Sequence, residues 1–344
     1  MTNIIRKEHL SDRVLFVDGQ NGCGKTLFSS IFASLSRLEV MSYIYELEMI
    51  CACFFVEKIS NDAALALTRM LTDLKLYNLM MGRETNFRPT DLSSVFKHQD
   101  VTKYFQRLFQ PGDEAVPKRI LDERPILNLA THNLLGISEP IFQSLGDRCV
   151  FVEVVRHPLY MIRQQRLNMQ NLLENVRNFS VNIEYRGRSL PYYTHGWEED
   201  FVNSTTATEK SVRSIYHLTK RTELAKKMLK EKYNAKIITI PFEHFVLNPD
   251  PWLKKVCNLL QTEPTENTST VMFQQNIPRK KVSDGIALAI YQRCGWEPPK
   301  ENISEKGELL IRRKEFSKEL SKEHASLLDQ ICMRYESTYW ELYE

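Results

Sequence analysis

The chain has 344 residues, of which 42% are hydrophobic and 26% are charged, and its formal net charge is +3. This composition is ordinary for a globular protein, and lysine and arginine are spread too evenly to indicate a nucleic-acid-binding face. The seven cysteines lack the paired spacing of a zinc site. The longest apolar run, 49–56, is too short to cross a membrane, and residues 1–12 do not resemble a signal peptide. We therefore expect a cytoplasmic protein with neither membrane nor nucleic acid as a partner.

Segments with the patterns of strands and helices alternate along the chain, which is typical of a parallel α/β sheet. The apolar run 14–18 predicts the first strand, and the apolar spacing of 27–35 predicts a helix after it. In chain order the pattern then predicts a strand at 40–45, helices at 62–81 and 100–109, strands at 126–130 and 149–155, a helix at 159–178, a surface excursion at 185–206, a helix at 211–232, a strand at 236–240, and helices at 252–261, 284–293 and 316–344. We expect a three-layer α/β/α fold, in which helices flank an open parallel sheet like that of phosphate-loop NTPases.

No linker or repeat divides the chain. We therefore expect a single domain over 1–344, with a core at about 12–285 and a helical extension at about 305–344. The apolar stripe of the last predicted helix suits a dimer contact as well as packing on the sheet, so the sequence leaves both a homodimer and a monomer open.

The segment 19–26 reads Gly-Gln-Asn-Gly-Cys-Gly-Lys-Thr and stands between the first predicted strand and the first predicted helix. Its glycines can adopt positive φ, which lets backbone N–H groups close around an anion at the helix N-terminus. Lys25 adds a full positive charge, and Thr26 adds a hydroxyl. The sequence therefore predicts a phosphate-binding loop, with ligands from Gly22, Cys23, Gly24, Lys25, Thr26 and Leu27.

A second cation, Arg156, stands where the strand 149–155 ends and where Pro158 opens the next predicted helix. Ligands of open parallel sheets bind at the carboxyl edge of the strands. Arg156 therefore falls on the same edge as the phosphate loop, where its guanidinium is suited to grip a second phosphate.

Together these segments resemble the sulfotransferase superfamily, whose donor substrate is 3′-phosphoadenosine 5′-phosphosulfate (PAPS). The resemblance runs from about residue 12 to 285. It implies that the loop 19–26 holds the donor's 5′-phosphosulfate and that Arg156 holds its 3′-phosphate. Eight residues after this arginine the family often has a serine that also binds the 3′-phosphate, and this chain has Gln164 there. The late basic loop that closes on the same phosphate corresponds to a segment containing Arg279 and Lys280.

Two residues are candidates for the base that takes the acceptor's proton. Thr131-His132 is similar to the Thr-His pair that carries the base of the cytosolic sulfotransferases, and an imidazole just past a strand lies at the ligand-binding edge. Glu46 is the alternative, because glycosaminoglycan-type sulfotransferases place a catalytic glutamate about 20 residues after the loop threonine, and a small shift of the strand end would exchange it for Glu48. We expect Lys25 to stabilise the bridging oxygen as it departs.

The order Gly24-Lys25-Thr26 departs from the sulfotransferase pattern, in which lysine usually precedes the last glycine, and it is the form found in ATP- and GTP-binding proteins. A small-molecule kinase or other phosphate-loop NTPase using Mg-ATP is therefore the alternative function. A nucleotide-binding protein without transferase activity is a third. Kinases need a strand-end aspartate to hold Mg²⁺, and no predicted strand after the first ends in aspartate. This favours a sulfuryl donor, which needs no metal.

The acceptor is the least defined part of the prediction. Stretches at 82–89, 185–188 and 192–197 combine arginines or a histidine with aromatic residues, which suits a carbohydrate or another polar small molecule. The sequence therefore predicts transfer of a sulfuryl group from PAPS to a hydroxyl or amine of such an acceptor.

Overall fold

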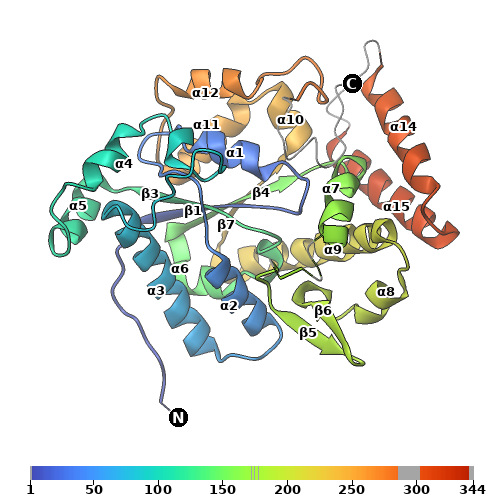
Figure 1. Cartoon of the computed structure of the whole chain (residues 1–344), viewed down its shortest axis with the longest axis horizontal. Helices are drawn as coiled ribbons and strands as arrows, with labels where there is room; N and C mark the ends of the chain where they lie inside the picture. The colour runs from blue at the N-terminus through green and yellow to red at the C-terminus, as the bar shows by residue number, and fades with distance from the viewer. Residues whose placement is uncertain (1, 172, 174, 177, 286–302, 341–344) are drawn as a thin grey trace.

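The computed structural model describes residues 2–171, 173, 175–176, 178–285 and 303–340 (Figure 1). Within these residues, a central sheet is built from five parallel strands in the order β2-β3-β1-β4-β7. The strands are β1 (Arg13–Asp18), β2 (Ser42–Tyr43), β3 (Ile126–Ala130), β4 (Cys149–Val155) and β7 (Lys236–Pro241). The three inner strands are almost wholly buried, as expected for apolar strands covered on both faces.

Helices cover both faces of this sheet (Figure 1). One face carries α1 (Lys25–Phe32), α10 (Phe242–Leu247), α11 (Asp250–Leu260) and α12 (Thr268–Gln274), and the other carries α2 (Tyr45–Phe55), α3 (Asn61–Met80) and α6 (Glu139–Leu145). The remaining helices are α4 (Thr102–Arg107), α5 (Ala115–Glu123), α7 (Pro158–Asn171), α8 (Glu198–Asn203), α9 (Ala207–Tyr233), α14 (Glu305–Ser317) and α15 (Lys322–Tyr339). The predicted three-layer α/β/α fold is confirmed. None of the described helices has the length and apolarity needed to cross a bilayer.

Most predicted elements are present within a few residues, but the segment 40–45 is not a full strand. β2 has only two residues, and α2 already begins at Tyr45. Glu46 and Glu48 stand in the first turn of α2, where carboxylates interact favourably with the helix dipole. Both glutamates therefore belong to a helix rather than to a strand end.

Two further expectations need correction, and a third lies outside the described residues. The excursion 185–206 overlaps a hairpin of β5 (Asn182–Tyr185) and β6 (Arg188–Pro191), followed by α8. The long helix predicted at 316–344 is instead the end of α14 and then α15, because Ser321 caps a new helix by accepting from His324 N. The helix predicted at 284–293 falls on 286–302, outside the described residues, apart from two residues that are not helical.

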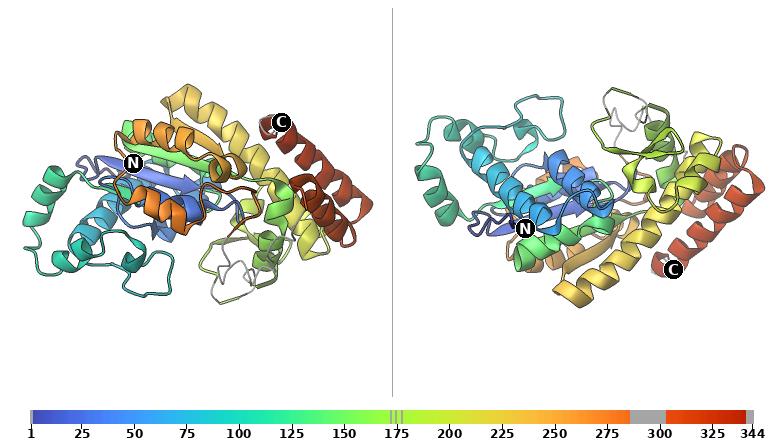
Figure 2. Two further views of the ribbon diagram at one scale, coloured as in Figure 1. Left: turned by 90° about the horizontal axis from the view of Figure 1, so that it is seen from above. Right: turned by 90° about the horizontal axis from the view of Figure 1, so that it is seen from below.

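The C-terminal helices α14 and α15 pack beside α7 and α9 at one end of the molecule (Figures 1 and 2). Arg163 of α7 pairs with Glu315 at 2.5 Å, and Arg166 pairs with Glu319 at 2.9 Å. Tyr160 of α7 donates to Glu305 at 2.6 Å. Polar contacts therefore join α7 to this helix pair along several turns.

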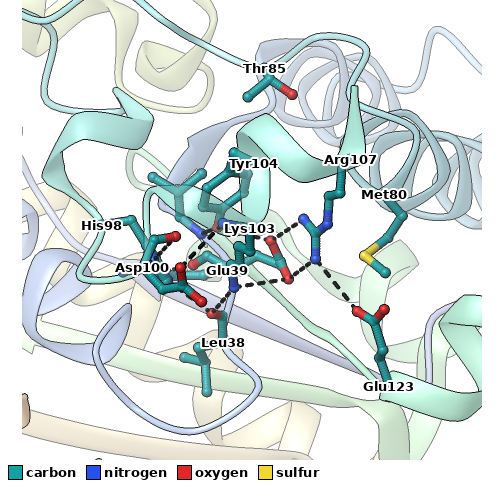
Figure 3. Close-up of polar contacts among 12 residues, drawn as sticks. Leu38, Glu39, Met80, Thr85, His98, Asp100, Lys103, Tyr104, Arg107 and Glu123 are labelled. Carbon is teal, nitrogen blue, oxygen red and sulfur yellow. Dashed lines mark hydrogen bonds and ion pairs between the residues drawn. The ribbon is translucent and has the colours of Figure 1, made fainter. Parts of the chain in front are cut away.

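A buried ion cluster fixes α4 to the chain just before β2 (Figure 3). The Glu39 carboxylate accepts from both terminal nitrogens of Arg107 at 2.8 Å, from the Tyr104 hydroxyl at 2.9 Å and from Lys103 Nζ at 3.3 Å. Burial alone would raise the pKa of Glu39, but Lys103 and the hydrogen bonds from Arg107 lower it to about 2. His98 lies beside the cluster, with its Nε2 3.3 Å from the Leu38 carbonyl and its ring 5.3 Å from that of Tyr104.

Candidate functional site

The segments singled out in the sequence all follow the carboxyl ends of sheet strands. The phosphate loop follows β1, the His132 segment follows β3, and Arg156 follows β4. Phe242 follows β7 at the same edge. Because the strands are parallel, these turns meet on one side of the sheet.

The phosphate loop has the backbone geometry of an anion-binding nest. Gly22 and Gly24 have φ of 88° and 97°, and their amides make no hydrogen bond to any described residue. The amides of Cys23 and Leu27 are used inside the loop, where they donate to Gln20 O at 3.1 Å and Gly24 O at 3.0 Å. Burial raises the pKa of the Cys23 thiol, so this residue is a neutral thiol and not an anion in the loop.

Lys25 and the segment after β3 share one acceptor on the phosphate loop. The Gly19 carbonyl accepts from Lys25 Nζ at 3.2 Å and from the Asn133 amide at 3.3 Å. Lys25 is buried, and no described carboxylate pairs with it. Its positive charge therefore lies at the mouth of the glycine loop, next to the residue that follows His132.

Arg156 points at the phosphate loop. Its Nη1 donates to the Gly22 carbonyl at 3.2 Å, and its guanidinium lies 4.1 Å from the centroid of the Phe242 ring. Arg279 approaches the same ring at 5.5 Å, and its guanidinium donates to the carbonyls of Asn276 and Val282 in its own loop. Two of the arginines expected at the donor's 3′-phosphate are therefore brought together.

The surroundings of Arg156 fit an anionic ligand. Its Nε is buried without a hydrogen-bond partner among the described residues, and none of their carboxylates pairs with it. A Cβ at Gly24 would stand 2.4 Å from the Phe242 ring, so the loop needs glycine where that ring packs. Free loop amides, a lysine and an unpaired guanidinium nitrogen are the donor set that phosphate and sulfate groups require.

Gln164 and Lys280, the other residues predicted at the 3′-phosphate, differ in how close they lie to the phosphate loop. Gln164 packs against the loop, with its Cβ 3.0 Å from where a Cβ of Gly22 would lie. Lys280 is exposed, and no hydrogen bond or ion pair joins it to the phosphate loop among the described residues. The arginines nearest to Gln164 in the sequence, Arg163 and Arg166, are paired with Glu315 and Glu319 of the C-terminal segment.

His132 is held by a buried carboxylate. The Glu48 Oε1 atom accepts from the His132 backbone amide and from its Nδ1–H, both at 3.1 Å, and Glu48 is 3% exposed. This arrangement keeps the proton on Nδ1 and leaves the Nε2 lone pair available for a substrate proton. The pair has the form of a general base with its orienting carboxylate.

Tyr43 links the histidine to the phosphate loop. Its ring stacks on that of His132 with 5.8 Å between centroids, and its hydroxyl lies near the side chain of Thr26. Burial raises the pKa of Tyr43 to about 12, so its hydroxyl remains protonated at neutral pH. Neither Tyr43 nor the Glu48 orientation was found from sequence, because their only signal is proximity in the fold.

Glu46 does not join this pair. It is exposed in the first turn of α2 and lines a neighbouring groove of about 310 Å³ together with Tyr43 and Tyr45. Glu84 and Asn86, from the stretch expected to meet the acceptor, line the same groove. The aromatic stretch 192–197 is not an open surface, because Tyr192 and Trp197 are buried in two hydrophobic clusters.

Two carboxylates close to the phosphate loop, those of Asp18 and Glu153, already accept hydrogen bonds from other protein groups. Asp18 accepts from the Thr131 hydroxyl at 2.8 Å and from the amides of Leu134 and Leu135 at 3.0 and 2.8 Å. Glu153 is bound to Lys226 at 2.6 Å and to Thr239 at 2.5 Å. The described residues contain no group of three or more histidine, cysteine or acidic side chains arranged to hold a metal.

No family model and no curated protein matches this sequence. Among solved structures, the chain is similar to the sulfotransferase domain of the Synechococcus PCC 7002 olefin synthase, with 16% identity, a TM-score of 0.38 and coverage of 93% of this chain and 100% of that one. It is also similar to the sulfotransferase domain of the curacin biosynthetic pathway, with 13% identity, a TM-score of 0.44 and coverage of 85% and 100%. The sulfotransferase STF1 of Mycobacterium tuberculosis H37Rv gives 11% identity, a TM-score of 0.37 and coverage of 90% and 77%. These similarities are too low to identify a donor or an acceptor for this chain, so any proposal about them depends on the geometry of the site.

Proposed function

We propose that this protein is a sulfotransferase that moves a sulfuryl group from PAPS to a hydroxyl or amine of a small polar or carbohydrate acceptor. The observation that carries the proposal is the position of Arg156, whose Nη1 lies 3.2 Å from the Gly22 carbonyl. A second anion-binding group beside the loop suits a nucleotide with phosphates at both the 5′ and the 3′ position. An ordinary nucleoside triphosphate has no 3′-phosphate for it to bind.

The chain's own residues supply the roles that this reaction needs. The amides of Gly22 and Gly24 and the Lys25 ammonium bind and neutralise the 5′ anion, and Arg156 with Arg279 binds the 3′-phosphate. The donor supplies the sulfuryl group and leaves as adenosine 3′,5′-bisphosphate. His132 Nε2 takes the proton from the acceptor's nucleophilic oxygen or nitrogen, with Glu48 holding the imidazole.

Ligand-induced stabilisation tests the proposal without knowledge of the acceptor. Melting temperatures of the wild-type chain and of Arg156→Ala are measured with adenosine 3′,5′-bisphosphate, with ADP, and with ATP plus magnesium. A ligand at 100 times its Kd adds about 2.7 kcal/mol of stability, which such an assay detects. We expect adenosine 3′,5′-bisphosphate to stabilise the wild type most, and Arg156→Ala to lose that advantage over ADP.

The Gly24-Lys25-Thr26 order keeps a kinase as the second candidate. Greater stabilisation by ATP, dependent on magnesium and unaffected by Arg156→Ala, would establish the kinase and refute the sulfotransferase. Equal stabilisation by all three ligands would also refute it.

A further inference from the structure

The residue after Arg156 is clamped by the C-terminal helix. His157 is fully buried, and its Nε2–H donates to Glu336 of α15 at 3.0 Å, since its Nδ1 accepts from the Leu159 amide. The His157 ring also lies 5.5 Å from the ring of Tyr335 and 5.6 Å from that of Trp340, measured between centroids. Three residues from the last turns of α15 and its C-terminal end therefore contact a single residue of the β4–α7 turn.

A buried carboxylate completes the clamp from the other side. Glu243 is 0% exposed, and its two oxygens accept from the His157 backbone amide at 3.0 Å and from the Tyr335 hydroxyl at 2.6 Å. The Glu243 carboxylate therefore connects α15 to the turn that carries Arg156. Glu243 also directly follows Phe242, whose ring contacts the Arg156 guanidinium.

The helix also reaches the back of the phosphate loop. Tyr335 and Arg156 line one cavity of about 120 Å³ with Gly19 and Gln20. Tyr160, whose ring stacks under Arg156 at 5.0 Å, is itself held by Glu305 of α14. Among the described residues, two rings contact the Arg156 guanidinium, and both are connected to the C-terminal helices. Tyr160 is bound to Glu305 of α14, and Phe242 precedes Glu243, which is bound to Tyr335 of α15.

We infer that Tyr335 and Glu336 of α15 are positioning residues of the donor site, which hold Arg156 in register with the phosphate loop through Glu243 and His157. This rests on the proposed function, since it concerns the part of the site assigned to the 3′-phosphate. The C-terminal helices are then a working part of the nucleotide site and not a separate appendage. Loss of either side chain leaves the loop unchanged and frees the β4–α7 turn to move.

Calorimetric titration with two nucleotides isolates this effect. Adenosine 3′,5′-bisphosphate uses both the loop and Arg156, whereas adenosine 5′-monophosphate uses the loop alone, so the ratio of their affinities reports Arg156. We expect Tyr335→Phe and Glu336→Ala each to weaken bisphosphate binding roughly five- to tenfold, the usual cost of an unmade buried hydrogen bond. Binding of the monophosphate should change less than about twofold.

A matched control and a double variant separate positioning from general stability. Glu323→Gln removes an ion pair between α15 and Arg213 far from the turn, and it should leave both affinities unchanged. In an Arg156→Ala background, Tyr335→Phe should cost nothing more, because coupled residues are not additive. Melting temperatures of all variants verify that they fold.

The outcomes distinguish this inference from the function on which it rests. A wild type that prefers the bisphosphate, together with α15 variants that keep the full preference, would overturn the positioning role and leave the donor site intact. Equal losses for both nucleotides would also overturn it, since they indicate a structural role. A wild type without any preference for the 3′-phosphate would overturn the proposed function itself.

Discussion

Lys25 carries the only full positive charge inside the glycine turn, and its Nζ lies 3.2 Å from the Gly19 carbonyl. Its replacement by methionine keeps the buried aliphatic stem and removes the charge that we propose stabilises the departing phosphate oxygen. We expect Lys25→Met to fold normally and to lower the rate of transfer roughly 10²- to 10³-fold, as losses of such electrostatic groups do. Release of adenosine 3′,5′-bisphosphate from PAPS, measured with a panel of saccharide and amine acceptors, checks this. A variant with near wild-type rates would remove Lys25 from the mechanism.

The pairing of His132 with Glu48 supports the proposal that His132, and not Glu46, is the base. We expect His132→Ala to lower kcat roughly 10²- to 10⁴-fold, the usual contribution of a general base, with little effect on the KM for PAPS. Glu48→Gln should give a smaller loss in kcat, because it disturbs the imidazole orientation but keeps an oxygen acceptor. Glu46→Gln is the matched control, since that carboxylate is exposed in the neighbouring groove. If Glu46→Gln lowered kcat strongly and His132→Ala left it unchanged, Glu46 and not His132 would be the base.

The sequence placed Lys25, His132 and Arg156 at the carboxyl edge of the sheet, because each lies in the first turn or loop after a strand whose apolar pattern is plain. It could not choose Glu48 over Glu46. That choice depends on where β2 ends and α2 begins, and two residues along a helix turn a side chain to the opposite face. Phe242 and Tyr43 were missed for a similar reason, since aromatic residues after strands are common and only the fold brings these two against the phosphate loop.

The ion cluster around Glu39 holds α4 against the chain that leads into β2. Both Glu39 and Arg107 are less than 5% exposed, so removal of one charge leaves the other buried and uncompensated. We expect Glu39→Gln to lower the free energy of unfolding by about 3–5 kcal/mol. Urea unfolding at pH 7 measures this, with the exposed Glu231→Gln as a control that should differ by less than about 0.5 kcal/mol. A loss below 1 kcal/mol at Glu39 would contradict the picture of a buried, fully paired cluster.

The same cluster predicts how stability depends on pH. Because the pKa of Glu39 is lowered from 4.5 to about 2 in the folded protein, its contribution is fully present above pH 4.5 and is lost as the pH falls towards 2. The wild type should therefore lose roughly 3 kcal/mol more than Glu39→Gln between pH 5 and pH 2. Urea unfolding of the two proteins across this range tests the difference, and parallel curves would show that Glu39 titrates normally.

Among the helices and strands, the buried β1, β3 and β4 and the long α3 were predicted to within one residue and α9 to within four, because one pattern runs through each. The break between α14 and α15 was not, since the apolar stripe continues past Ser321 and only the capping hydroxyl marks the new start. The residues of α15 that contact His157 lie more than 150 residues after it in the chain, and no local sequence pattern reports contacts over such a distance.

The fold of the molecule brings three distant stretches to one edge of its sheet: the glycine loop after β1, the His132 segment after β3 and Arg156 after β4. The helices of α14 and α15 then close against the last of these from the end of the chain (Figure 2). Because the strands are parallel, the segments after them must meet at one edge of the sheet, and so their meeting could be predicted from sequence. The contacts of α14 and α15 with this edge do not follow from the strand order and could not be predicted.

The central claim is that this edge binds an adenosine nucleotide at both of its phosphates. A crystal structure of the wild-type protein with adenosine 3′,5′-bisphosphate tests it most directly. The account predicts the 5′-phosphate on the amides of Gly22 and Gly24 beside Lys25, and the 3′-phosphate within hydrogen-bond distance of the Arg156 guanidinium. A nucleotide whose 3′-phosphate points to solvent, with Arg156 still on the Gly22 carbonyl, would contradict it.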